Sequence, residues 1–259
     1  MVLLSVPGLP WRHSFYQMIN YQQRSYQKEL LDGNDIPFED IAENMRELDF
    51  INTHLGGHSI TINGFKSLLQ NRKTISVCEI GCGGGDNLNA LNQFCKKNNI
   101  VALFTGIDIN KDCIDYAKKN LLAISPKAVE INFIISDYRN VHFKNRKPDI
   151  IFSSLFCHHF NDDELVEMLH WMSNNSEIGF FINDLHRHPI AYHFIKMATT
   201  LFSKSYLVKN DAPLSVLRGF KKNEWEKIFQ KAGIAGYSIK WKWAFRHLIT
   251  NVKNENPQI

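Results

Sequence analysis

Residues 74–86 read Thr-Ile-Ser-Val-Cys-Glu-Ile-Gly-Cys-Gly-Gly-Gly-Asp and are the most informative segment of the chain. The β-prone run 75–80 leads directly into a turn with glycine at alternate positions: Gly81, Gly83 and Gly85. A helical pattern follows over residues 86–94. A strand, a glycine turn and a helix N-terminus form a nucleotide-binding corner, because glycines let a ligand approach the backbone. The same pattern also closes βα units that bind nothing.

The spacing of the glycines and the residues beside them indicate which class of nucleotide cofactor the turn can bind. Asp86 stands where the dinucleotide-binding fingerprint has a third Gly or Ala, and its carboxylate would repel a pyrophosphate. A phosphate-binding loop would need Gly-Lys-Ser/Thr, which is absent from the turn. Glu79 at the strand end favours a cationic partner. S-adenosylmethionine, which has a nucleoside, an ammonium and a sulfonium but no phosphate, fits these features.

The stretch from Glu79 to Gly85 resembles motif I of class I S-adenosylmethionine-dependent methyltransferases. The resemblance implies a doubly wound α/β fold, with a Rossmann-like seven-stranded sheet that ends in an antiparallel β-hairpin. It implies S-adenosyl-L-methionine as cofactor and S-adenosyl-L-homocysteine as product. The motif residues implied to bind the cofactor are Glu79, Gly81, Gly83 and Gly85.

Two further predicted strands end in acids. Strand 101–108 ends in Asp108, about 20 residues beyond the turn, where an acid binds ribose hydroxyls. The resemblance gives Asp108 this role and places Ile109 against the adenine, although a solvated Asp at a strand end is the plain alternative. Strand 129–135 is followed by Asp137 and Tyr138, which the resemblance places beside the adenine. Ser-Asp is also ordinary turn chemistry.

Four histidines follow the next two predicted strands. Strand 148–154 ends at Ser154, which the resemblance places facing the methyl donor, and the fifth strand begins at Gly179. Ligands of open α/β sheets bind at the carboxyl ends of the strands. The candidates for a general base there are His158, His159, His186 and His188. We favour His186 or His159, although each histidine taken alone also fits a structural role.

Methyl transfer needs alignment of acceptor, methyl and sulfur more than it needs a nucleophile or a metal from the protein, and no metal site is predicted. Positioning of reactants can supply roughly 7–11 kcal/mol. A phenol has a pKa of about 10 and is mostly protonated at neutral pH. A histidine base would therefore assist, by about 10²- to 10⁴-fold.

The chain divides into a helical N-terminal cap, residues 1–70, and a methyltransferase domain, residues 71–259, with a helical insertion at about 187–220. We expect helices over 16–31, 38–48 and 60–70 in the cap, and a loop over 209–213. The cap resembles that of quinone-biosynthesis and aromatic natural-product methyltransferases. Arg24 is a candidate to pair with the cofactor carboxylate, and a structural salt bridge is its alternative.

Composition narrows the class of protein. The 259 residues are 44% hydrophobic and 22% charged, enough for one substantial core. A net charge of +4, without a cluster of basic and aromatic residues, does not indicate a nucleic-acid partner. No apolar run reaches the length of a membrane span. The five cysteines lack a Cys-x-x-Cys pair, so we expect reduced thiols and a cytoplasmic location.

The sequence thus predicts methyl transfer to a small, largely apolar, aromatic molecule, at a phenolic oxygen first and a ring carbon second. The rival is a non-catalytic domain of the same fold that binds a nucleoside ligand or a partner protein. A protein methyltransferase is a third possibility. These motifs leave open the identity of the acceptor and the oligomeric state.

Overall fold

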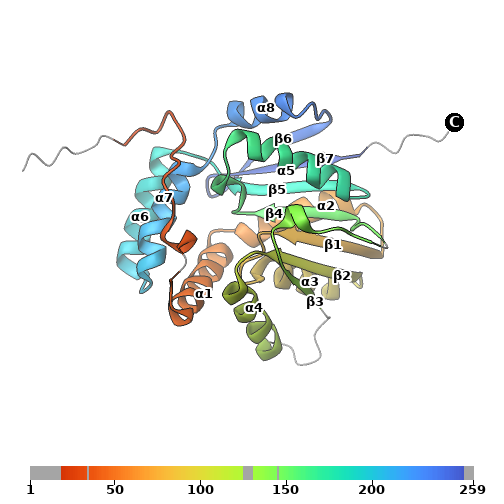
Figure 1. Cartoon of the computed structure of the whole chain (residues 1–259), viewed down its shortest axis with the longest axis horizontal. Helices are drawn as coiled ribbons and strands as arrows, with labels where there is room; N and C mark the ends of the chain where they lie inside the picture. Colours follow the sequence, from red (N-terminus) through yellow and green to blue (C-terminus); the bar gives the residue numbers. More distant parts are fainter. Residues whose placement is uncertain (1–18, 34, 125–130, 145, 254–259) are drawn as a thin grey trace, which may run out of the picture.

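The computed structural model describes residues 19–33, 35–124, 131–144 and 146–253. Its centre is a seven-stranded sheet in the order β3-β2-β1-β4-β5-β7-β6 (Figure 1). The strands are β1 Thr74–Ile80, β2 Val101–Asp108, β3 Ile131–Ile135, β4 Ile150–Ser154, β5 Gly179–Leu185, β6 Tyr237–Lys242 and β7 Arg246–Val252. The first five are parallel, while β7 pairs antiparallel with both β5 and β6. The predicted fold class is confirmed.

Helices cover the sheet and its edge. They are α1 Phe38–His54, α2 Gly57–Leu69, α3 Asp86–Lys97, α4 Lys111–Ile124, α5 Asp162–Asn175, α6 Pro189–Phe202, α7 Tyr206–Arg218 and α8 Lys222–Lys231. Three 3₁₀ turns are η1 Leu30–Asp32, η2 Tyr138–Asn140 and η3 Cys157–His159. In Figure 1, α1, α6 and α7 group together at one end of the sheet. Among the described residues, no helix combines the length and hydrophobicity needed to cross a bilayer.

The two faces of the sheet bury separate apolar clusters. Adjacent residues of β5 show the division, because side chains alternate between the faces of a strand. Phe180 packs with α5 and α8, and Phe181 packs with α2 and α3. The approach of α2 is close: a Cβ on Gly64 would lie 2.5 Å from the ring of Phe181. The sheet thus lies between two packed apolar layers.

The cap differs from expectation in its first part. The predicted helix over 16–31 is wrong for its described residues, where only the single turn η1 is helical; residues 16–18 lie outside the described ranges. Hydrogen bonds to distant elements replace those of a helix there. The backbone N–H of Ser25 donates to the carbonyl of Leu217, and the Arg24 guanidinium donates to the carbonyl of Phe160. The second predicted helix is present and runs on to His54.

The predicted loop over 209–213 is also wrong, because these residues belong to α7. Ser205 caps this helix by accepting the N–H of Val208, and Pro213 lies inside it. The Asp211 carboxylate accepts the backbone N–H groups of Leu30 and Leu31, at 2.8 and 3.0 Å. An acid in the presumed loop therefore fixes η1 on the body of the protein.

Candidate functional site

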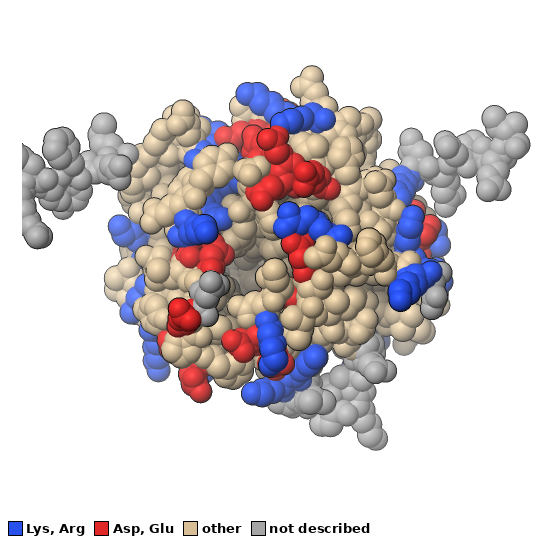
Figure 2. Space-filling model, in the orientation of Figure 1, with Lys and Arg blue, Asp and Glu red and all other residues tan. Residues whose placement is uncertain are grey.

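A cavity of about 760 Å³ lies at the carboxyl ends of β1, β2 and β4. The face seen in Figure 2 is hollowed near its middle, and acidic side chains lie around the hollow. One part of the cavity wall consists of the glycine turn and the polar residues that follow β2 and β3. Another part is apolar and comes from α1, α6 and α7. The sequence-predicted residues that line the cavity are Glu79, Gly81, Gly83, Asp108, Ile109, Asp137, Tyr138, Ser154, His158 and His159.

The glycines of the turn serve different purposes. Gly83 has a φ of +48°, and a Cβ there would meet only the Met45 sulfur, at 3.5 Å. At Gly81, with a φ of +66°, a Cβ would lie 2.2 Å from the ring of Phe156. Gly85 has a φ of +74°, precedes the first residue of α3 and does not line the cavity. Gly83 thus keeps the cavity open, Gly81 makes room for an aromatic ring and Gly85 permits the turn into the helix.

Asp108 closes the turn from the second strand. Its carboxylate accepts the backbone N–H of Gly83 and of Asn110, each at 2.8 Å. Burial raises the pKa of this carboxyl. Ile109 beside it is exposed, as an apolar side chain that contacts a ligand in a cavity would be.

The acid after β3 lies on the same wall. Asp137 accepts the backbone N–H of Arg139 at 2.9 Å and pairs with its guanidinium, which lowers the pKa of the carboxyl. The Tyr138 ring packs edge-on against Trp171 and is buried. Ser154, at the end of β4, accepts from the Asn183 amide at 3.3 Å. These three residues and Asp108 surround the polar part of the cavity.

Glu79 is a buried carboxyl with unmet bonding capacity. Its side chain is 1% exposed, and its Oε2 has no hydrogen-bond partner within the described residues. Burial raises the pKa of Glu79 well above its ordinary value, and the charges of Asp86 and Asp108 add to this. Asp86 itself accepts from the Asn52 amide and contacts His58 Nε2, both at 2.9 Å. Burial opposes ionisation of Asp86, but His58 outweighs it and lowers the pKa of that carboxyl. A cationic ligand group beside Glu79 would favour the ionised form of Glu79 in the same way.

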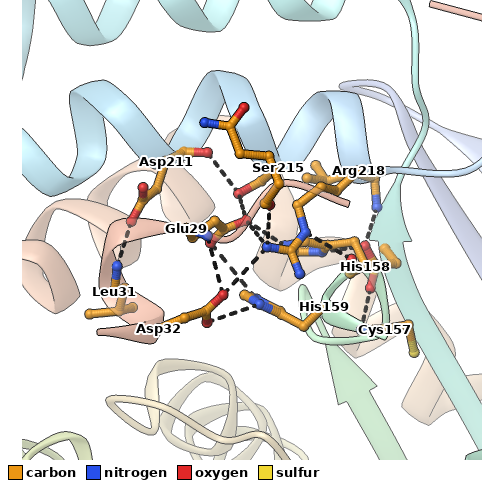
Figure 3. A network of polar contacts seen from close by, with 12 residues as sticks. Glu29, Leu31, Asp32, Cys157, His158, His159, Asp211, Ser215 and Arg218 are labelled. Carbon is orange, nitrogen blue, oxygen red and sulfur yellow. Dashed lines mark hydrogen bonds and ion pairs between the residues drawn. The ribbon is translucent and has the colours of Figure 1, made fainter. Parts of the chain in front are cut away.

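His158 lies in a buried ionic network that links the cap to the sheet edge (Figure 3). Its Nδ1 is 2.9 Å from Asp184 Oδ1 on β5, and its Nε2 is 3.5 Å from Glu29 Oε1 in the cap. Burial lowers the pKa of His158, but the two carboxylates outweigh it and raise the pKa to about 9. His158 is therefore an imidazolium at neutral pH, with both nitrogens engaged. It does not suit the role of base.

Arg218 and Asp32 complete the network. Arg218 Nη1 is 3.4 Å from Asp32 Oδ2 and 3.8 Å from Glu29 Oε1, and its Nε donates to the His158 carbonyl at 3.1 Å. Ser215 donates to Glu29 at 2.7 Å. These partners were not predicted from the sequence, although Glu29 lies in the predicted helix 16–31 of the cap and Asp32 directly follows it. Their significance depends on Ser215 and Arg218, which are nearly 200 residues away along the chain.

His159 is the candidate base with access to the cavity. Its side chain is 23% exposed, its Nδ1 is 3.4 Å from Asp32 Oδ1 and its Nε2 is 3.9 Å from Glu29 Oε2. The hydrogen bond and charge of His159, with Arg218, overcome the effect of burial and lower the pKa of Asp32 to about 2. Asp32 is thus a carboxylate at neutral pH that can orient the imidazole.

The other two histidines lie outside the cavity wall. His186 is 3.2 Å from the Trp241 indole nitrogen, and burial, with His247 and His188 nearby, lowers its pKa to about 4. His188 caps α6 by accepting the N–H of Ile190. Our preference for His186 as a base is not supported by this geometry. The strand carries both histidines past the edge, toward the β6–β7 hairpin.

Arg24 also lies away from the cavity. Its guanidinium donates to Asp162 Oδ1 at 2.9 Å and to the Phe160 carbonyl at 2.8 Å, and it stacks at 4.0 Å from the Phe220 ring centroid. Its donors are used within the protein. The alternative of a structural salt bridge therefore describes Arg24 better than a cofactor contact does.

Within the described part of the chain, two groups of side chains could each offer three donor atoms to one metal ion. They are Glu29 with His158 and His159, and Asp49 with His58 and Asp86. In each group a histidine nitrogen already faces a carboxylate, and Arg218 adds a positive charge to the first. Ion pairing accounts for both groups.

All five cysteines are buried and free, with burial raising the thiol pKa values.

Residues 77–177 match the family model described as "Methyltransferase domain". The plantazolicin methyltransferase BpumL, in complex with a monoazolic analog and SAH, superposes with a TM-score of 0.59 at 18% identity, covering 84% of this chain and 89% of that chain. A putative O-methyltransferase from Nostoc punctiforme PCC 73102 superposes with a TM-score of 0.54 at 14% identity, covering 80% and 59%. A search of curated proteins found no match. The chain has the fold of these methyltransferases, and its match to the methyltransferase family model covers residues 77–177.

The network around His158 predicts a dependence of stability on pH. Because its pKa is raised from 6.5 to about 9 by folding, the protonated imidazole contributes stability fully below pH 6.5, and this is lost as the pH rises through 9. We expect the free energy of unfolding from urea titrations to fall over this interval. His158→Gln should flatten that fall, whereas His170→Gln, an exposed histidine of α5, should keep it. An unchanged slope in His158→Gln would contradict the ionic network.

Proposed function

We propose that this protein transfers a methyl group from S-adenosylmethionine to a small, largely apolar, aromatic acceptor, at a phenolic oxygen or, as second choice, a ring carbon. One observation carries the proposal. The same cavity is lined by the glycine turn with Asp108, by an apolar wall from three helices, and by His159. A cofactor and an acceptor could therefore meet beside a proton acceptor.

The polar part of the cavity fits the cofactor. Gly83 leaves space where a side chain would stand, and the Asp108 carboxylate has capacity beyond its two backbone donors to accept ribose hydroxyls. Glu79 offers an unpartnered oxygen, and a positive charge on the ligand beside it would favour its ionised form. S-adenosylmethionine, when bound, supplies the electrophilic methyl group. The residues of this chain hold its nucleoside and favour its positive charge.

The apolar part suits an acceptor with a hydrocarbon or aromatic body. Its walls come from α1, α6 and α7 and from the turn between β6 and β7. The apolar lining residues are Leu48, Ile51, Leu55, Leu185, Ala191, Phe194, Ile195, Val208, Ala212, Val216 and Phe245. Such a wall excludes water and fixes orientation, and positioning of this kind can supply roughly 7–11 kcal/mol of the barrier.

His159 is the proposed base. With Asp32 Oδ1 3.4 Å from its Nδ1, the tautomer with a proton on Nδ1 is favoured, which leaves Nε2 to accept a proton. A phenol that gives up this proton becomes a much stronger nucleophile. Asp32 and Glu29 then stabilise the imidazolium that forms. Asp32 acts through His159 and is a positioning residue.

The cofactor part of the proposal predicts ligand binding. S-adenosylhomocysteine should raise the melting temperature of the purified protein by mass action. Gly83→Val should abolish the shift, because a branched side chain at a φ of +48° would be strained and would fill the cavity. Asp108→Ala should weaken binding by about 1.5–3 kcal/mol, measured by calorimetry. Asp163→Ala, at an exposed acid on α5, is the matched control. Full binding by Gly83→Val, or tight binding of NAD, would overturn the site.

Methyl transfer to a phenolic acceptor should depend on a general base, which we assign to His159. In turnover assays with simple phenols, His159→Ala should lower kcat by about 10²- to 10⁴-fold while affinity for S-adenosylhomocysteine stays within a few-fold. The rising limb of the kcat/KM profile with pH should disappear. His170→Ala is the control, and His186→Ala should retain activity. Near-normal rates in His159→Ala would leave positioning alone to carry the reaction. Ligand binding without turnover of any acceptor would instead favour a non-catalytic domain.

A further inference from the structure

Arg246 is a buried cation without a carboxylate partner. It is the first residue of β7 and is 4% exposed, yet it lines the cavity. Its Nη2 donates to Asn52 Oδ1 at 2.8 Å, while its Nη1 has no hydrogen-bond partner. Across the ranges that the structure describes, it makes no ion pair. Burial lowers the pKa of its guanidinium to about 10, so the group is still charged at neutral pH.

The Arg246 guanidinium is positioned by uncharged neighbours, Gly57 and Asn52. A Cβ on Gly57 would lie 3.0 Å from Arg246 Nη1, so the glycine at the start of α2 admits the group. Asn52 accepts from Arg246 and donates to Asp86 Oδ2 at 2.9 Å. This amide therefore connects the guanidinium to the first residue of α3, directly after the glycine turn. Asn52 and Asp86 also line the cavity.

The cavity thus holds two buried groups of opposite character with unmet bonding capacity, Arg246 and Glu79. Burial of an unpaired charge is unfavourable, and a carboxylate that enters the cavity would remove that penalty. Guanidinium groups bind carboxylates through parallel N–H donors. The pair is suited to a ligand with an ammonium and a carboxylate, as in an α-amino acid.

We infer that Arg246, held by Asn52, binds the α-carboxylate of the cofactor's amino-acid portion, with Glu79 on the side of its ammonium. The inference rests on the proposed function and names the contact that sequence reasoning assigned to Arg24. A ligand that lacks the amino-acid portion gains nothing from this site. The site therefore distinguishes S-adenosylhomocysteine from 5′-methylthioadenosine, which has the same nucleoside and a thioether.

The test compares the dissociation constants of these two ligands by calorimetry, in the wild type and in Arg246→Gln. The variant should lose about 10- to 100-fold in affinity for S-adenosylhomocysteine, as for loss of a hydrogen-bonded charge, and keep its affinity for 5′-methylthioadenosine within about threefold. Asn52→Ala should show a smaller loss of the same kind. Arg46→Gln, at an exposed arginine of α1, is the matched control. Arg24→Gln tests the assignment made from sequence and should leave the ratio of the two affinities unchanged.

The melting temperature of Arg246→Gln without ligand shows whether a loss of affinity comes from a loss of stability. Removal of an unpaired buried charge should leave that temperature unchanged or raise it, whereas loss of a structural salt bridge would lower it. Unchanged affinity for S-adenosylhomocysteine in Arg246→Gln, or an equal loss for both ligands, would overturn the inference. If Arg246→Gln does not fold, the inference is rejected unless Asn52→Ala shows the selective loss. A wild type that binds neither ligand would mean that the proposed function itself fails.

Discussion

The Asp184 carboxylate joins the cap to the carboxyl edge of the sheet through His158, and this connection holds two walls of the cavity together. It lies near the end of β5 and accepts hydrogen bonds from His158 Nδ1, at 2.9 Å, and from the backbone N–H of Cys157, at 2.8 Å. His158 in turn faces Glu29, which comes from the cap. Because all three side chains are buried, removal of any one would leave an uncompensated charge in the interior.

This network explains why the cap lacks its expected first helix. The segment around Glu29 runs across the sheet edge and is held there by α7, through Asp211 and Ser215, and by Arg218. In that position it forms one wall of the cavity and brings Asp32 beside His159. The proposed base is therefore oriented by a residue of the cap, while the proposed cofactor contacts come from the sheet. Assembly of the site requires both parts.

The sheet and much of the cofactor side could be predicted from the sequence, because their signals are local. The strand, the glycine turn and Asp108 follow one another at short spacing, and the parallel register brings their carboxyl ends together. The resemblance to class I methyltransferases also implied the terminal antiparallel hairpin, which β6 and β7 form.

The remainder could not be predicted, because it depends on partners far apart in the chain. His186 and His159 look equivalent in sequence, yet one faces Trp241 and the other faces the cavity. Arg24 and Arg246 are both buried, but only Arg24 finds a carboxylate, that of Asp162. The sequence pattern predicts a helix over 16–31, but hydrogen bonds to α7 and to the chain near η3 outweigh local propensity in its described residues. In each case the deciding contact comes from another element.

A crystal structure of the protein with S-adenosylhomocysteine would show whether this cavity holds the cofactor beside the proposed acceptor site. We expect the ribose hydroxyls within hydrogen-bond distance of Asp108, the homocysteine carboxylate at Arg246, and the sulfur facing the apolar wall near His159. A ligand bound elsewhere, or a ribose without contact to Asp108, would show that the cavity is not the cofactor site.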